Sequence, residues 1–179
     1  GGLAEDLSSV ILNSEDVEVV RAGAPAYLIM LDALLNSDPD NTALLTSAAS
    51  LNAAYATAFV DDRVRRQAFA VKSFELSSRA ACLKIEWTCS ARTVDLKQLE
   101  LSLADLEASD VPLTYAFGSA WAGWVQAHSE DWAAIAELGR IKAIMTRLVA
   151  INEKYDNGGP RLYLGVFETL LPPALGGRP

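Results

Sequence analysis

The stretch YAFGSAWAGWVQAHSEDW, from Tyr115 to Trp132, constrains the fold more than any other part of the chain. It contains three of the four tryptophans and the single histidine, and no strongly polar side chain precedes Gln126. Its periodicity is helical, so it predicts a helix over residues 112–127 that is apolar on every side. A helix of this kind needs cover on every side, which predicts that it lies inside a layered array of helices.

Two faces of this predicted helix differ in side-chain size. Residues spaced by three or four positions share a face of a helix. One face is aromatic and consists of Phe117, Trp121, Trp124 and His128. A second face, about 100° away, carries only small residues, namely Ala116, Ala120, Gly123 and Ala127. The sequence leaves two interpretations open, in which the aromatic side chains either fill a core or form the wall of a cavity for an apolar ligand.

The remaining chain has helical periodicity nearly throughout, and the alternation typical of strands is missing. Further helices are predicted to start near Asn13 and to cover Ala24–Leu35, Thr42–Phe59, Asp61 or Asp62 to about Lys84, Leu96–Ala108, Ser129 to about Ile151, and Arg161–Leu171. Short connections join them, and short connections favour antiparallel hairpins. We therefore expect an all-α fold of about eight helices in a single domain over residues 1–179.

Polar and glycine-rich segments mark the ends of these helices. Asn13 with Asp16, Asp40 or Asn41, and Ser129 are predicted N-caps. KIEWTCSARTVD is predicted to be an irregular connection, EKYDNGGP a turn, and LPPALGGRP a loop.

Composition and motifs exclude several classes of function. The net charge is −8 and the pI is about 4.6, whereas proteins that bind nucleic acid present basic stripes. The densest basic run, Arg63, Arg65 and Arg66, follows two aspartates and indicates a solvated helix start. No segment reaches the ~20 apolar residues of a membrane span. The sequence has no nucleophile elbow, phosphate loop or paired metal ligands, so we expect no enzymatic activity and no cofactor.

Two cysteines and one histidine are the remaining reactive side chains. Cys82 and Cys89 are seven positions apart, and the sequence alone allows either a disulfide or two free thiols. His128 ends the aromatic helix without an identified titratable partner, so we expect it to be a structural or exposed residue rather than a general base.

Several segments carry the punctuation of divergent tetratricopeptide-like repeats. LLNSDPDN resembles the junction between two repeats, FGSAW and YLGVFE resemble first helices, and Ala70, Phe74 and Ser77 have the spacing of a second helix. Longer strings are more specific. RAGAPAYLIMLDALL, AASLNAAYATAFVDD and the string from Phe117 to Pro179 are similar to the T-component family of TRAP transporters (TatT-like proteins), over residues 16–179.

The resemblance implies an accessory protein without catalytic activity. It implies a periplasmic, lipid-anchored protein with stacked tetratricopeptide-like hairpins, which assembles into homo-oligomers such as trimers. The implied partner is the substrate-binding protein of a tripartite ATP-independent periplasmic (TRAP) transporter, and a hydrophobic channel implies an apolar ligand. An oxidising periplasm favours the Cys82–Cys89 disulfide.

Two departures from the family pattern affect these expectations. The lipid-carrying cysteine is absent from this sequence, and the family continues past Pro179 with further helices. We therefore expect apolar side chains of the last helix to lose cover and to promote self-association. These side chains are Leu162, Leu164, Val166, Phe167 and Leu170.

The leading hypothesis is a helical scaffold that docks the transporter's binding protein and binds an apolar ligand. The alternative is a structural helical-repeat oligomer without a ligand, which a filled interior around Trp121 would favour. Large aromatic residues beside small ones leave room for a ligand. On that basis the candidate groove residues are Tyr115, Phe117, Trp121, Trp124, Trp132 and Tyr163.

Overall fold

A computed structural model describes residues 2–170 of the chain, and all regular elements in that part are helical. The α-helices are α1 (Leu3–Leu12), α2 (Val17–Ser37), α3 (Thr42–Phe59), α4 (Arg63–Cys82), α5 (Leu96–Ala104), α6 (Val111–Ala127), α7 (Trp132–Ala136), α8 (Leu138–Ile151) and α9 (Gly159–Leu170). Short 3-10 helices lie at Glu86–Ser90, Ala108–Asp110 and Tyr155–Gly158. The predicted all-α class is confirmed, whereas the loop predicted for residues 171–179 lies outside the described residues.

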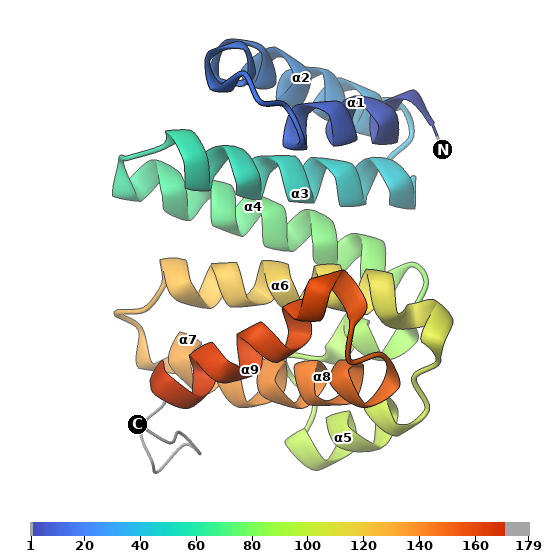
Figure 1. Cartoon of the computed structure of the whole chain (residues 1–179). Helices are drawn as coiled ribbons and strands as arrows, with labels where there is room; N and C mark the ends of the chain where they lie inside the picture. The colour runs from blue at the N-terminus through green and yellow to red at the C-terminus, as the bar shows by residue number, and fades with distance from the viewer. Residues whose placement is uncertain (1, 171–179) are drawn as a thin grey trace.

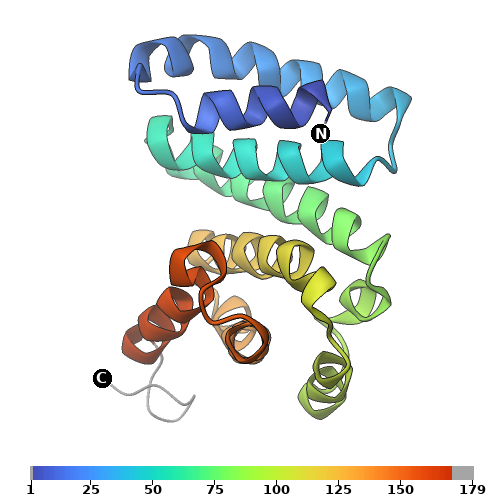
Figure 2. The ribbon, with the colours of Figure 1, turned by 45° about the vertical axis from the view of Figure 1, so that its right-hand side comes forward.

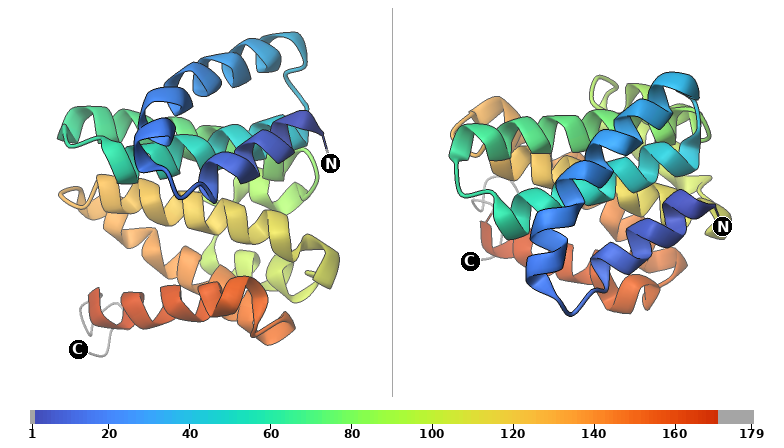
Figure 3. Two further views of the ribbon diagram at one scale, coloured as in Figure 1. Left: turned by 45° about the horizontal axis from the view of Figure 1, so that its top comes forward. Right: turned by 90° about the horizontal axis from the view of Figure 1, so that it is seen from above.

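The helices stack in layers along the molecule (Figure 1). Helices α1 and α2 cover α3, which forms an antiparallel hairpin with α4. Helix α4 packs on α6, α6 on α8, and α8 on α9 and α5. Figure 2 shows the same order from the side, and Figure 3 shows α2 crossing over the α3–α4 layer at one end of the stack. Helix α6 therefore lies between α4 and α8, as its apolar sequence predicted.

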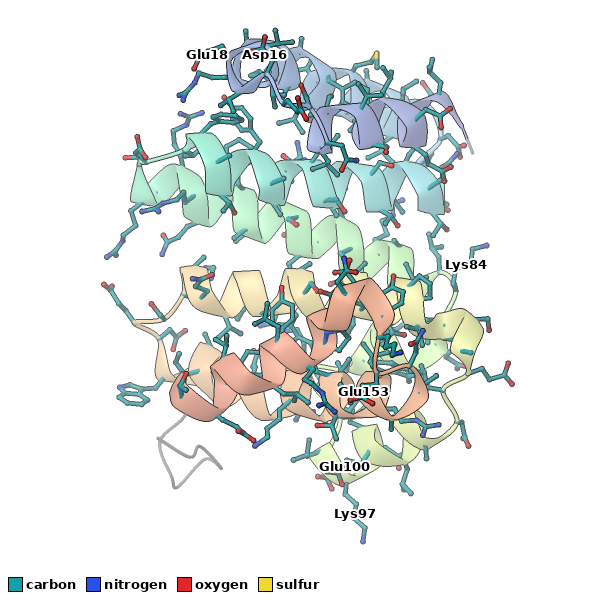
Figure 4. All side chains as sticks on the ribbon, in the orientation of Figure 1. Asp16, Glu18, Lys84, Lys97, Glu100 and Glu153 are labelled. Carbon is teal, nitrogen blue, oxygen red and sulfur yellow. A yellow bond between two sulfur atoms is a disulfide. The ribbon has the colours of Figure 1, made fainter. Side chains whose placement is uncertain are left out.

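Acidic and amide side chains cap most of these helices by accepting hydrogen bonds from free backbone N–H groups. Asn41 accepts from the N–H of Leu44 at 3.0 Å, and Asp62 accepts from that of Arg65 at 2.8 Å. At α2 the cap is Asp16 rather than Asn13, and Figure 4 shows Asp16 beside Glu18 at the start of that helix. Asn13 instead follows the last residue of α1, a helix that the sequence analysis did not predict.

Helix α2 joins the helix predicted to start near Asn13 with the one predicted over Ala24–Leu35, and it continues through Pro25. Proline lacks the backbone N–H that would complete a helical hydrogen bond, which costs stability inside a helix. Packing outweighs this cost, because Tyr27, Leu28 and Leu31 on the following turns are buried in the N-terminal core. The predicted new start at Ala24 is therefore wrong.

The helix predicted from Ser129 to Ile151 is two helices, α7 and α8, and its cap is Asp131 rather than Ser129. The break falls at Glu137, whose N–H bonds the carbonyl of Ala134. The carboxylate of Glu137, at this break, accepts a hydrogen bond from Trp121 of α6. The irregular connection and the turn at residues 153–160 are confirmed.

Buried apolar residues form two clusters. The larger cluster joins α4, α5, α6, α8 and α9 around Phe117 and Trp121. The smaller cluster joins α2 and α3 around Leu31 and Leu51, with side chains of α1 packed against it. Helix α6 belongs to the larger cluster through one side only, and its other side provides the candidate site.

Candidate functional site

One side of α6 is fully packed. Phe117 and Trp121 are 1% and 0% exposed and lie against Phe74 of α4, with ring centroids 5.9 and 5.8 Å away. On the same side, a Cβ added to Gly118 would lie 2.9 Å from the Cε of Met145 on α8. Any larger residue here would require the flexible end of Met145 to move.

A polar network closes this packed side. The indole N–H of Trp121 donates to Oε2 of Glu137 at 2.6 Å, and the guanidinium of Arg92 donates to both carboxylate oxygens at 3.0 and 2.7 Å. The same guanidinium lies 4.4 Å from the ring centroid of Trp124, within the range of a cation–π contact. His128 stacks on Trp124 at 4.4 Å, which gives the histidine a structural role.

The opposite side of α6 lines an open groove of about 820 Å³ between α6, α3 and α4. All four members of the small-residue face predicted from the sequence line it. These residues are Ala116, Ala120, Gly123 and Ala127. Facing them are small side chains of α3 and α4, namely Thr46, Ala49, Ser50, Ala53, Ala56, Thr57, Ala70, Ser73 and Ser77. No atom lies within 4 Å of a Cβ added to Gly123, so this part of α6 faces open space.

One end of the groove is cationic. Arg63 and Arg66, in the first turn of α4, line it together with Gln67. The guanidinium of Arg63 donates to both carboxylate oxygens of Glu130 at 2.7 and 3.1 Å. Gln67 donates to the backbone carbonyl of Ala127 at 2.8 Å and thereby fastens α4 to the end of α6. Arg66 is exposed and forms no ion pair with any residue in the described part of the chain.

The other end of the groove carries three tyrosines. The ring of Tyr115 meets the rings of Tyr155 and Tyr163 edge-on, with centroids 5.3 and 6.2 Å away. Burial, followed by the hydrogen bond to the Asp156 carboxylate, raises the pKa of the Tyr115 hydroxyl well above its ordinary value. The nearby Ser119 hydroxyl acts weakly in the opposite direction. Ser119 lines the groove, and its buried oxygen has no hydrogen-bond partner of good geometry.

A left-handed turn brings Asp156 to Tyr115. Asp156, Asn157 and Gly158 all have positive φ, at 47°, 54° and 84°. Asp, Asn and Gly tolerate this region best among the amino acids, so the sequence suits the turn. A Cβ at Gly159 would overlap the Tyr115 hydroxyl, so the next residue must be glycine as well.

The six candidate residues separate into three locations. Tyr115 and Tyr163 line the groove. Phe117 and Trp121 lie in the core. Trp124 packs against that core, with the guanidinium of Arg92 over its ring. Trp132, at the start of α7, is 77% exposed and does not line the groove.

Sequence reasoning thus identified both faces of α6 but included Phe117, Trp121 and Trp124 of the aromatic face among the candidate groove residues. The space lies over the small-residue face, whose spacing of 116, 120, 123 and 127 was the available signal. The sequence analysis did not predict the arginine end, because the basic run that contains Arg63 and Arg66 is typical of a solvated helix start.

Other features of the chain do not add to this site. Cys82 and Cys89 form a disulfide that joins the end of α4 to the following 3-10 helix. A smaller apolar pocket of about 270 Å³ lies between α1, α2 and α3. Among the described residues, no three His, Cys, Asp or Glu side chains gather closely enough to hold a metal ion.

The same part of the chain contains no helix with the length and apolarity needed to cross a membrane. None of the functionally curated proteins matches the sequence. The family model described as TRAP transporter T-component matches residues 13–179, which includes every residue of the groove. The chain therefore belongs to the TRAP transporter T-component family.

Proposed function

We propose that this protein docks the substrate-binding protein of a TRAP transporter and holds an apolar ligand in the groove between α3, α4 and α6. Its accessory role in TRAP transport follows from the family. The groove is the observation that carries the ligand-binding part of the proposal. About 820 Å³ lies within the range of small-molecule sites, and small side chains line most of it.

The stacked helices suit the docking part of the proposal. Stacked helical hairpins present extended surfaces to which a partner protein binds. The substrate-binding proteins of TRAP systems work in the periplasm, so we also propose a periplasmic location with lipid attachment at the membrane.

A structural homo-oligomer without a ligand is the competing function. The filled core around Trp121 favours it, because the aromatic residues of α6 leave no cavity there. Leu162 and Val166 on α9 are 70% and 43% exposed, and apolar surface of this kind is often covered by another subunit. Phe167, also expected to lose cover, is 4% exposed. Self-association through α9 therefore remains a prediction.

Native mass spectrometry of the protein, alone and with the TRAP substrate-binding protein, tests the proposal. We expect a complex of the two proteins and an apolar adduct on the T-component. Gly123→Leu fills the groove and should remove the adduct. Gly23→Leu is the matched control, because Gly23 is also an exposed helical glycine facing open space but lies outside the groove.

Each outcome discriminates between the functions. A native protein that carries no adduct and ignores the binding protein would contradict the proposal and leave the structural oligomer. Equal loss of the adduct in both glycine variants would show that the ligand binds elsewhere.

A further inference from the structure

We infer that the groove selects an amphipathic anion, with its charged group at the Arg63–Arg66 end and its single apolar chain extending towards the tyrosines. This inference rests on the proposed ligand-binding function and specifies the chemical class of the ligand.

The shape of the groove supports an elongated ligand. Its lining follows α6 from Pro112 to Ala127, which spans about 22 Å at the rise of an α-helix. Alanines of α3, α4 and α6 alternate in the middle with Gly123 and with Ser50, Ser73 and Ser77. The alanine methyl groups offer apolar contact to a linear chain along this length.

The charged side chains make the two ends of the groove chemically different. Among residues 2–170, the charged side chains that line it are Arg63, Arg66 and Glu130, and all three lie at one end. Glu130 neutralises Arg63 through two hydrogen bonds, so the guanidinium of Arg66 is the excess charge. This end of the groove is cationic although the chain as a whole has a net charge of −8. A guanidinium is suited to two hydrogen bonds with one carboxylate.

The opposite end disfavours an anion. Its carboxylate, Asp156, lies behind Tyr115 and accepts the hydrogen bond of that hydroxyl. An anionic group placed there would lie near a like charge, whereas an apolar chain end would contact the tyrosine rings. The two ends therefore favour the same orientation of an amphipathic anion.

Isothermal titration calorimetry of the full chain at pH 8 tests the inference with three probes of equal chain length: dodecanoate, dodecanol and dodecyltrimethylammonium. We expect dodecanoate to bind about two- to five-fold more tightly than dodecanol, as for an exposed charge pair. The cationic probe should bind most weakly. Arg66→Gln should abolish the preference for dodecanoate and leave dodecanol binding unchanged.

Two further variants make the result specific. Arg65→Gln removes the same charge from the neighbouring residue, which does not line the groove, and should preserve the preference. Glu130→Gln releases Arg63 and removes a like charge, so it should tighten dodecanoate binding. A gain of affinity cannot arise from a damaged fold.

The outcomes separate this inference from the proposed function. Equal binding of all three probes, with loss of binding in Gly123→Leu, would overturn the anion selectivity and leave the apolar groove intact. Equal effects of Arg65→Gln and Arg66→Gln would also overturn it, because the preference would then reflect net charge. Absence of binding by every probe would overturn this inference and the ligand-binding part of the proposed function.

Discussion

The two sides of α6 differ in nearly every physical respect although they share one helix and one apolar sequence. On the core side, Phe117 and Trp121 are buried completely, and α8 approaches so closely that Gly118 touches Met145. On the groove side, Gly123 faces open space and small side chains line a volume of about 820 Å³. Phe117 and Trp121 therefore fill the contact with α4, whereas the small-residue face of α6 lines open space.

Each side of α6 also has its own arginine–glutamate pair. The Arg92–Glu137 pair covers the core, accepts the Trp121 indole N–H and stacks on Trp124. The Arg63–Glu130 pair lies at the groove end, with side chains 65% and 75% exposed. The first pair completes the packing of aromatic rings, whereas the second leaves its charges available to solvent and to a ligand.

Trp121→Ala should have the largest effect on stability. It leaves a large cavity in the core and removes the hydrogen bond to Glu137, so we expect a loss of about 3–5 kcal/mol in the free energy of unfolding. Trp132→Ala is the control, because this tryptophan is 77% exposed, and its change should stay within about 0.5 kcal/mol. Chemical denaturation followed by circular dichroism measures both. Similar losses in the two variants would show that the core side does not have the packing described.

Leucine at the two glycines of α6 should change stability in opposite directions. Gly118→Leu forces a side chain against Met145 and Ile144, and overpacking of this kind costs about 1–3 kcal/mol. At Gly123 an added Cβ has no neighbour within 4 Å. Gly123→Leu should therefore raise the free energy of unfolding by up to about 1 kcal/mol, because glycine disfavours helices.

The same denaturation measurement compares these glycine variants. Destabilisation by both would indicate that a neighbouring element covers the small-residue face. Stabilisation by both would indicate that α6 and α8 are further apart than the contact at Gly118 implies.

The sequence predicted the fold well where local signals determine structure. Asn41 and Asp62 cap their helices as expected, and the DNG turn adopts the left-handed conformation that these residues tolerate. The predicted helix boundaries were wrong where contacts between residues distant in the sequence determine them. The helix through Pro25 depends on burial in the N-terminal core, and the break at Glu137 is matched by its bonds to Trp121 and Arg92 on other elements.

The same distinction between local signals and distant contacts applies to the candidate site. Helical periodicity identified the small-residue face of α6, because residues 116, 120, 123 and 127 follow a local rule. Periodicity cannot show whether a face meets another helix or open space. That difference depends on how α3 and α4 pack around α6. As a result, Tyr115 and Tyr163 line the groove while Phe117 and Trp121 fill the core.

The smallest expected effect concerns Tyr115, one of the three tyrosines that line the groove. Its pKa is raised in the folded protein, first by burial and then by Asp156. Above pH ~10 the unfolded chain therefore releases this proton while the folded protein keeps it, so stability falls as pH rises. Tyr115→Phe should reduce this alkaline loss of stability. Asp156→Asn keeps a residue type that tolerates positive φ. It should reduce the alkaline loss of stability less than Tyr115→Phe does, because burial raises the pKa of Tyr115 more than the Asp156 carboxylate does. Chemical denaturation at pH 9 to 11 gives the slope of the free energy of unfolding against pH for the unaltered protein and the two variants. A larger effect of Asp156→Asn than of Tyr115→Phe would show that the carboxylate, and not burial, is the main cause of the alkaline loss of stability.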